Sequence, residues 1–540
     1  MPVPTYLNPI KFTINNFIVF VLILIPIFLF YSLFFHFLTN IPYIDDFSWY
    51  FNFINKFDSA NAFQDKLHTF LDPYNNHRHY FQRLLIIPFV YLTGQINISF
   101  FIIIGNISFI AFLSTIIRKT NLIGSAVLVW LAFQPISFMN YYTFAFFNLP
   151  VFLFSLLCIR LMVQQGTLRW IILLGLLATF SNGNGLLVWL LGILISLVQK
   201  DGKRLIVYGA TLSLLILVYS LQGGQADSPR VIDVEFISHA LLYFIQIHAY
   251  FVNWPDYALP WIPLLIGTGL LLIVGYLVIK NKPFYYKSEK SYLLVYLLFL
   301  SLSMALISFL RSSVNGLNAN VIDHYKIYPC LFLGILIYYC TEQKSLTTFW
   351  KYSFVAISIL ITLVNYTIYI PRMYTHFTNQ VADALNYHST KKWLFYPVIQ
   401  GKKEYEFVNT VSNAVIKKGY YSEIEPSITE TNTRYEANAD STKSGLILRA
   451  ENLTYSPFSE HVFFVVNCGS YQYHFPVLSD RSWKDILRFR FQQTSINAVI
   501  DWNALNEPCL SHFDKIRFAR LKNGSLTYYP LSVVAKSLTK

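Results

Sequence analysis

The chain has 540 residues, of which 55% are hydrophobic and only 13% are charged, and its formal net charge is +13. Soluble globular proteins carry about 25% charged residues, so this composition excludes an ordinary soluble protein and predicts a polytopic membrane protein. We attribute the positive charge to basic cytoplasmic loops and anionic lipid headgroups. A nucleic-acid partner is not expected, because no basic stripe occurs on a soluble face.

The first 370 residues predict about eleven membrane-spanning helices, several of them shorter than the ~20 residues that a perpendicular span needs. We expect these helices near residues 17–38, 96–117, 122–138, 144–163, 168–182, 184–199, 204–221, 259–279, 291–310, 326–340 and 350–370. Residues 371–540 are richer in charge and predict a separate domain, helical over 371–420 and mostly β, with a β-sandwich-like fold, over 440–540.

The distribution of Lys and Arg predicts the orientation of the spans. With the N-terminus in the cytoplasm, most bases of residues 1–370 fall in inner loops and most acids in outer loops. Bases flank both ends of residues 168–199, so the chain must turn back within this segment, and the Gly- and Asn-rich residues 181–185 supply the turn. The odd number of spans then places the C-terminal domain outside the cytoplasm.

The first outer loop, residues 39–95, holds the most informative polar residues. Asp45 and Asp46 follow the first span, and aromatic residues 47–57 predict a helix lying in the membrane interface. Residues 84–92 predict a second interfacial or re-entrant piece, which Pro88 should break. Ionisable residues so close to a bilayer are usually functional, so we expect a site here.

These residue types suit acid–base chemistry on an anionic substrate. Asp45 and Asp46 offer a general base or metal ligands, since a carboxylate near a low-dielectric interface can hold a pKa suited to accepting a hydroxyl proton. His77, Arg78 and Arg83 offer phosphate-binding groups. The alternative is structural: the two acids would cap the interfacial helix, and the arginines would anchor at lipid headgroups.

The order of these segments resembles the GT-C superfamily, polytopic glycosyltransferases that use a polyprenyl-phosphate-linked sugar as donor. The pair Asp45-Asp46 matches the acidic element in the first outer loop of that family. Three further segments resemble family stretches: residues 74–84 (E-H-R…F-P-R-L, with Asn76 in place of Glu), residues 184–189 (G-N-G…W) and residues 323–328 (S-R-Y, with His324 in place of Arg). The resemblance covers about residues 15–340.

The resemblance implies an inverting transfer on the outer face of a membrane, the bacterial inner membrane in the envelope or O-antigen-modifying type. The sugar would pass from a polyprenyl-phosphate donor to a glycan or lipid-linked acceptor, with a carboxylate as base. Some members need a divalent cation such as Mg²⁺ or Mn²⁺, which Asp45 and Asp46 would hold, and others need none. The residues expected to bind the lipid phosphate are His77, Arg78, Arg83, Arg311, His324, Tyr325 and Lys326.

Four polar residues at outer turns are candidates for contacts with sugar or acceptor hydroxyls: Asn140, Tyr141, Asn182 and Asn184. Turn chemistry is the alternative explanation for them, and snorkelling at helix ends is the alternative for Arg311 and Lys326. In the outer domain, Cys468 and Cys509 would suit a disulfide in an oxidising compartment, but their spacing does not fix the pairing.

Two other functions share this membrane setting. A transporter or flippase of lipid-linked glycans would need polar residues deep in the spans and related repeats, and the sequence has no internal repeat. A glycan polymerase or ligase would use pyrophosphate-linked glycans, and only the acidic pair of the first loop argues against it. The sequence does not identify the sugar, the acceptor or the linkage.

Overall fold

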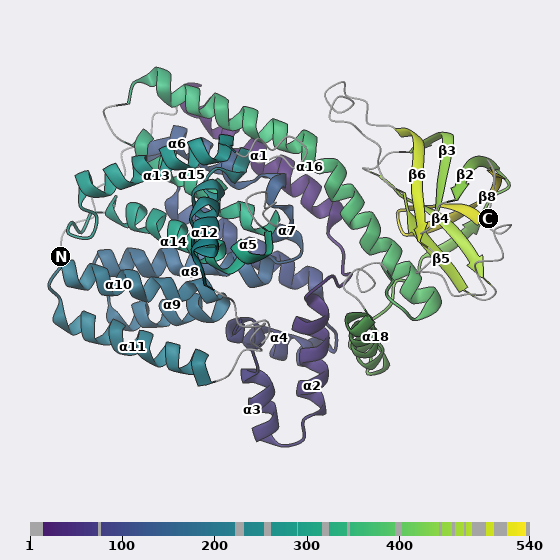
Figure 1. Cartoon of the computed structure of the whole chain (residues 1–540), viewed down its shortest axis with the longest axis horizontal. Helices are drawn as coiled ribbons and strands as arrows, with labels where there is room; N and C mark the ends of the chain where they lie inside the picture. The colour runs from purple at the N-terminus through teal and green to yellow at the C-terminus, as the bar shows by residue number, and fades with distance from the viewer. Residues whose placement is uncertain are drawn as a thin grey trace. The chain divides into compact units, whose positions relative to one another are not determined.

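The computed structural model of this chain describes residues 14–73, 77–221, 232–252, 261–288, 290–315, 323–342, 346–394, 402–441, 445–455, 459–468, 471–477, 493–501 and 516–535. It is mostly helical, with a strand-rich C-terminal part (Figure 1). Asn76 and Cys509, which entered the sequence-based predictions, lie outside these ranges.

The chain packs into two compact units. One, here called the helical unit, comprises Met1–Phe35, Gly105–Phe144 and Asn148–Asn365. The other, the mixed unit, comprises His36–Ile104, Ala145–Phe147 and Tyr366–Lys540. The mixed unit therefore joins the predicted first outer loop to the predicted C-terminal domain. The division into a membrane domain over residues 1–370 and a separate domain over residues 371–540 stays a prediction.

The helices outside the first loop are long and apolar. In the described residues, seven of them are long and apolar enough to cross a membrane: α1 (Ile14–Phe37, counted from Phe17), α5 (Ile98–Ile116), α8 (Ala145–Val163), α11 (Gly202–Leu221), α13 (Trp261–Asn281), α14 (Ser291–Asn315, counted to Arg311) and α16 (Thr348–Thr390). A bent pair, α6 (Leu122–Ala132) with η3–α7 (Pro135–Tyr142, at 46°), would make an eighth. Several apolar helices thus indicate a membrane protein.

Three further expected spans are shorter helices in the structure. They are α9 (Leu168–Ser181), η4–α10 (Gly183–Val198) and α15 (Ile327–Thr341), with 14 to 16 residues each. Each lies where the sequence predicts a span, but none reaches the ~20 residues of a perpendicular crossing. The total of eleven spans therefore stays a prediction. The helical unit also contains α12 (Val234–Ile247) and the short 3-10 helices η2 (Lys119–Asn121), η5 (Tyr250–Val252) and η7 (Asp323–Lys326).

The predicted turn within residues 168–199 is confirmed. Helix α9 ends at Ser181, Asn182 is extended, and η4 begins at Gly183. The side chains of Gln165 and Gln199, before α9 and after α10, are joined by a hydrogen bond of 2.9 Å. Residues on both sides of the break can meet in this way only if α10 runs back along α9.

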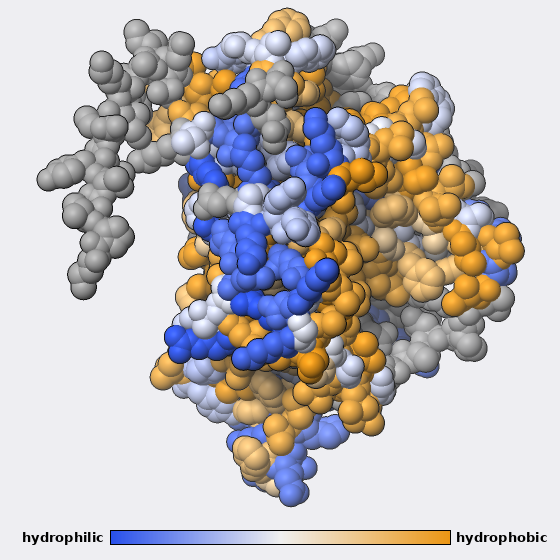
Figure 2. Space-filling model, turned by 90° about the vertical axis from the view of Figure 1, so that its left-hand side faces the viewer, coloured by the Kyte–Doolittle hydropathy of each residue, from blue (hydrophilic) through white to orange (hydrophobic). Residues whose placement is uncertain are grey.

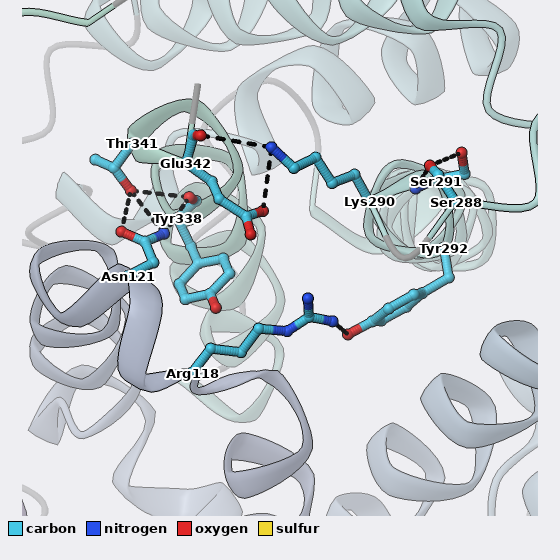
Figure 3. Close-up of polar contacts among 9 residues, drawn as sticks. All are labelled: Arg118, Asn121, Ser288, Lys290, Ser291, Tyr292, Tyr338, Thr341 and Glu342. Atoms are coloured by element: carbon cyan, nitrogen blue, oxygen red, sulfur yellow. Dashed lines mark hydrogen bonds and ion pairs between the residues drawn. The ribbon is translucent and has the colours of Figure 1, made fainter. Parts of the chain in front are cut away.

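A polar network at one end of the helical unit ties four helix ends together (Figure 3). Arg118 donates to the Tyr292 hydroxyl at 3.5 Å, and Lys290 forms an ion pair with Glu342 at 4.0 Å. Asn121 donates to the Tyr338 carbonyl and to the Thr341 hydroxyl at 2.9 and 3.1 Å.

Arg118, Lys290 and Glu342 of this network belong to loops that the sequence assigns to the cytoplasmic side. The face in Figure 2 shows a hydrophilic band between apolar surfaces, on the side where the connection from α10 to α11 lies in Figure 1. Exposed bases of the same predicted loops are Lys200, Lys203, Lys280, Lys282 and Lys287.

The first loop of the mixed unit is helical. It contains the π-helical η1 (Phe47–Asn52), α2 (Phe53–Ser59), α3 (Phe63–Leu71) and α4 (Tyr80–Thr93). The prediction that Pro88 breaks the last piece is wrong, because α4 continues through it. Pro88 removes one backbone donor, and the helix keeps its remaining bonds up to Gly94, whose φ of +71° ends it in the left-handed conformation.

The tail matches the predicted mixture of helices and strands. After α16 come α18 (Lys402–Lys417) and the strands β1 (Ser427–Glu430), β2 (Tyr435–Ser441), β3 (Gly445–Tyr455), β4 (His461–Cys468), β5 (Tyr471–Pro476), β6 (Gln493–Asp501), β7 (Ile516–Lys522) and β8 (Ser525–Ala535). Their order in the sheet is β5-β4-β7-β8-β2-β3-β6, with β1 also paired to β8. The Asn523-Gly524 turn between β7 and β8 has both φ angles positive, as a tight hairpin requires. Cys468 takes part in a disulfide.

Helix α16 and the residues after α18 connect the sheet and the first loop of the mixed unit. On the sheet side, Asn386 of α16 bonds both backbone groups of His474 in β5, at 2.6 and 3.0 Å. On the loop side, Lys418 forms an ion pair with Asp58 at 2.9 Å, and the Tyr421 hydroxyl donates to the Asn40 carbonyl at 2.7 Å. The C-terminal segment therefore holds the first loop directly.

Candidate functional site

The acidic pair of the mixed unit lies in a tight turn between α1 and η1. Ile44 has a φ of +49°, an uncommon conformation for a β-branched residue, and the Asp46 backbone N–H closes the turn on the Tyr43 carbonyl at 3.0 Å. The Ser48 and Trp49 N–H groups then bond the Asp45 carbonyl at 3.0 and 2.8 Å, which starts the helix. The turn fixes the backbone of both acids.

Asp46 is buried, and the described residues bond only one of its two carboxyl oxygens. Its Oδ2 accepts a hydrogen bond from the Tyr43 N–H at 2.9 Å, while its Oδ1 is buried and accepts none from the described residues. The side chain makes no capping bond to η1, so the helix-cap alternative does not account for it. Buried polar atoms without partners are rare in native proteins and call for an explanation.

The surroundings of Asp46 favour its neutral form. Burial raises the pKa of Asp46 well above its usual range, and the neighbouring Asp45 carboxylate raises it further, while the bond from the Tyr43 N–H opposes both effects. Asp45 is half-buried and thus more accessible. The two acids therefore differ: burial favours the neutral form of Asp46, while Asp45 is partly exposed.

The two histidines that directly precede α4 pack against rings, and Arg78 between them is buried. Arg78 and His79 are buried, and His77 is half-buried. The rings of His77 and His79 stack at 5.3 Å, which two residues on a helix could not do; here they precede α4, in non-helical backbone. His79 also contacts Trp49 of η1 and Phe147 at 5.4 and 4.9 Å.

Arg83 has a structural role in the same loop. Its Nη1 donates to the carbonyl oxygens of Thr69, Phe70 and Asp72 at 3.3, 2.6 and 2.6 Å, so it caps the C-terminus of α3. The guanidinium also lies 4.7 Å from the centre of the Phe53 ring. Burial lowers the pKa of Arg83 to about 10, where it is still charged at neutral pH. These contacts give Arg83 a role within the loop that needs no phosphate.

In the helical unit, the predicted phosphate-binding residues cluster where η7 leads into α15. Arg311 of α14 donates to the Tyr325 hydroxyl at 3.2 Å, and the rings of His324 and Tyr325 lie 4.0 Å apart. Lys326, the last residue of η7, is buried. The structure thus brings Arg311, His324, Tyr325 and Lys326 together around one helix start, although α14 and η7 are separated by residues 316–322.

A chain of asparagine amides extends from this cluster. Asn182 donates to Asn148 Oδ1 at 2.8 Å, Asn148 donates to Asn140 Oδ1 at 2.9 Å, and Asn140 donates to the His324 carbonyl. We call these three residues the asparagine relay. They come from the ends of α7, α8 and α9, which the relay and its carbonyl acceptor tie to η7.

The two remaining predicted sugar contacts differ from each other. Asn184 donates to the hydroxyls of Ser303 and Tyr328 at 3.1 and 3.0 Å, and its buried Oδ1 accepts no hydrogen bond from the described residues. The Tyr141 hydroxyl donates to the Ala132 carbonyl at 2.5 Å, and its fully buried ring lies 4.6 Å from Phe30. Tyr141 is therefore part of the packed core.

Sequence reasoning missed Asn148, the middle member of the relay. The signal was present, since Asn148 is a polar residue inside the predicted span 144–163, and such residues often mark function. It also missed Tyr43, whose contribution is a backbone N–H that no pattern of side chains reveals. In the part of the chain that the structure describes, no group of three or more His, Cys, Asp or Glu residues is placed to hold a metal ion. A cation at Asp45 and Asp46 stays a prediction.

Comparison with known proteins gives no relative of this chain: no protein-family model, no curated protein and no solved structure matches it.

Proposed function

We propose that the chain is a membrane glycosyltransferase that moves a sugar from a polyprenyl-phosphate carrier to a cell-envelope glycan or a lipid-linked acceptor. The observation that carries the proposal is the state of the acidic pair, in which a buried Asp46 carboxyl with an unused oxygen lies next to a more accessible Asp45. A purely structural acid would use its hydrogen-bonding capacity within the protein. The proposal includes eleven spans, a cytoplasmic N-terminus and an extracytoplasmic, β-sandwich-like C-terminal domain.

In this mechanism Asp45 is the general base. The acceptor hydroxyl attacks the anomeric carbon of the donor sugar on the face opposite the phosphate, and Asp45 takes the hydroxyl proton. The bond between the anomeric carbon and the phosphate oxygen breaks, its electron pair stays on that oxygen, and the configuration inverts. A neutral Asp46 supports Asp45, because a second negative charge beside the base would disfavour its ionised form.

The leaving group requires a second set of residues. Negative charge develops on the departing phosphate oxygen, and cationic groups that are already in place stabilise it. Arg311, Lys326 and His324 of the helical unit are the groups that we propose for contact with the donor phosphate, with Tyr325 oriented by its bond from Arg311. Arg78 and His77 are retained as further candidates for phosphate contact. A divalent cation at the acidic pair is not required by this mechanism.

The test is sugar transfer in membranes that contain the full chain at matched expression, with a polyprenyl-phosphate-linked hexose or pentose as donor. We expect Asp45→Asn to lower the rate by at least about 10³-fold, since it removes the base. Asp46→Asn should cost less, because the amide keeps the bond from the Tyr43 N–H. Asp65→Asn, which changes an exposed acid on α3 of the same loop, is the control and should leave transfer unchanged. Full activity of Asp45→Asn would sink the proposed base.

A further inference from the structure

We infer that the asparagine relay recognises the donor sugar. Asn182 accepts a hydrogen bond from a sugar hydroxyl, and Asn148 is the positioning residue that orients Asn182. The inference rests on the proposed function and goes beyond it in naming the chemical group that is recognised and the residue behind the recognition. It follows from the direction in which the three amides donate their hydrogen bonds.

The direction is set at the His324 end. A backbone carbonyl can only accept, so the Asn140 amide must turn its NH₂ group toward the His324 carbonyl. The Asn140 oxygen then faces Asn148 and must receive the Asn148 NH₂ group, at 2.9 Å. The Asn148 oxygen in turn receives the NH₂ group of Asn182, at 2.8 Å. One fixed acceptor therefore determines the orientation of all three amides.

The relay ends at the side-chain oxygen of Asn182, an acceptor that no described residue bonds. The backbone N–H of Asn182 bonds the Ala178 carbonyl and its backbone carbonyl accepts from Gly185. Its side-chain oxygen has no hydrogen bond to any described residue, and the residue is half-buried. Two residues further on, Asn184 repeats the pattern: its NH₂ group is used by Ser303 and Tyr328, and its oxygen is left without a donor among the described residues.

The side-chain oxygens of Asn182 and Asn184 indicate which chemical groups a ligand must offer. They can receive hydrogen bonds only from donors, and they repel an anion, so this end of the cluster suits neutral hydroxyl groups. The other end, with Arg311 and the buried Lys326, suits an anion. A sugar attached to a phosphate carries both kinds of group in one molecule: hydroxyls that can donate to the asparagine oxygens and a phosphate that can bind the cations.

The experiment separates binding of the sugar from binding of the lipid phosphate. The detergent-purified full chain is titrated with polyprenyl phosphate alone and with its glucosyl, mannosyl and arabinosyl derivatives. The quantity compared is the ratio of the two dissociation constants, lipid phosphate over lipid-phosphate sugar, which we call the sugar increment. We expect at least one sugar to give the wild type an increment of about tenfold, as one good hydrogen bond allows.

Three variants then test the relay. Asn182→Ala and Asn148→Leu should bring the sugar increment close to one, the second because Asn182 loses the oxygen that orients its amide. Asn148→Asp keeps an oxygen opposite the Asn182 NH₂ group, so it should keep the increment even if its charge weakens binding of every lipid phosphate. A merely structural role of Asn148 would give the reverse order, because at this half-buried position a carboxylate disturbs a fold more than a leucine does.

The matched control is Asn121→Leu. Asn121 is also a buried asparagine with a complete hydrogen-bond set, but it belongs to the network at the other end of α15 (Figure 3). It should lose thermal stability and keep the sugar increment. An increment that survives in Asn148→Leu or is absent from the wild type for every sugar overturns the relay inference alone. Failure of the wild type to bind polyprenyl phosphate at all overturns the proposed function, and the inference with it.

Discussion

The backbone N–H of Tyr43 donates the single hydrogen bond that the Asp46 carboxyl receives from the described residues, at 2.9 Å, while the other oxygen of that carboxyl is buried without a donor among them. One bond does not replace the water that a carboxylate loses on burial. The protein therefore holds Asp46 at a cost in stability, as is common where a residue is kept for function.

We expect Asp46→Asn to stabilise the protein at neutral pH. The amide oxygen can still accept from the Tyr43 N–H, and the amide is neutral without the proton that the carboxyl must take up on folding, so the gain should be about 1–2 kcal/mol. The folded-state pKa of Asp46 is raised, so its contribution to stability is complete below the unfolded pKa near 4 and is lost as the pH rises toward the folded value. The advantage of the variant should thus be present at pH 7.5 and vanish near pH 4.

Thermal unfolding of the purified full chain at pH 7.5 and about pH 4 measures this effect. Asp65→Asn, on the exposed surface of α3, should show no such pH-dependent gain. A lower melting temperature for Asp46→Asn at pH 7.5 would mean that the ionised carboxylate stabilises the fold, which contradicts our account of the pair.

Replacement of Arg83 should destabilise the last turn of α3 without weakening the binding of lipid phosphate. Arg83→Met removes the donor to three carbonyl oxygens at the end of α3 while keeping much of the contact with Phe53. We expect faster cleavage at Lys66 by trypsin, by about three- to tenfold, because the uncapped last turn frays. The affinity for polyprenyl phosphate should be unchanged. A selective loss of lipid-phosphate affinity with normal proteolysis would return Arg83 to the phosphate site.

Much of the architecture could be predicted from the sequence because it depends on local patterns. Apolar length located every long helix, and the Gly- and Asn-rich residues 181–185 located the turn between α9 and α10. Alternation and the Asn523-Gly524 turn predict β3, β4, β5 and the β7–β8 hairpin, but not β1, β2 or β6. What could not be predicted is non-local. The parallel pairing of β8 with β1 and β2, and the attachment of Lys418 to Asp58, join residues far apart in the sequence.

The candidate site divides in the same way. Residue type and position in an outer loop were enough to select Asp45, Asp46 and the η7 residues. They did not distinguish Arg83, which caps a helix, from Arg311, which bonds Tyr325, because both are bases near helix ends. Asn140 and Tyr141 are adjacent residues with polar groups, yet Asn140 joins the relay and Tyr141 packs in the core. Such differences depend on which partner lies opposite a side chain, and one sequence does not contain that information.

Acid should destabilise the sheet of the mixed unit through His474. Burial, with the nearby Arg517, lowers the pKa of His474 to about 3, so the folded state keeps this ring neutral. The unfolded state takes up a proton below about pH 6.5, so stability is complete above that value and falls as the pH drops. Between pH 6.5 and 4 the loss should be on the order of 2–3 kcal/mol. His474→Gln should reduce this slope in urea unfolding of the full chain, and the exposed His68→Gln should not.

Gly185 tests a close backbone contact between η4 and α9 in the helical unit. A Cβ at this position would lie 2.2 Å from the carbonyl carbon and oxygen of Ala178. These are backbone atoms of α9, so a change of side-chain rotamer cannot relieve the clash. Gly185→Ala must therefore push η4 away from α9, which would also move Asn182 and Asn184 on either side of it. We expect a loss of at least about 3 kcal/mol in stability, as for other severe steric insertions into a packed structure.

The control for Gly185→Ala is Gly209→Ala on α11, where an added Cβ meets nothing within 4 Å. In a helix interior that change should be neutral or stabilising by up to about 1 kcal/mol, because alanine loses less conformational entropy than glycine. Thermal unfolding of both variants, read with the sugar increment of the lipid-phosphate titrations, separates two effects. If the turn positions the relay, Gly185→Ala variants that still fold will lose the sugar increment while they keep affinity for polyprenyl phosphate. If Gly185→Ala proves as stable as Gly209→Ala, the close approach of η4 to α9 is not a constraint on this protein, and the geometry that we assign to Asn182 and Asn184 loses its foundation.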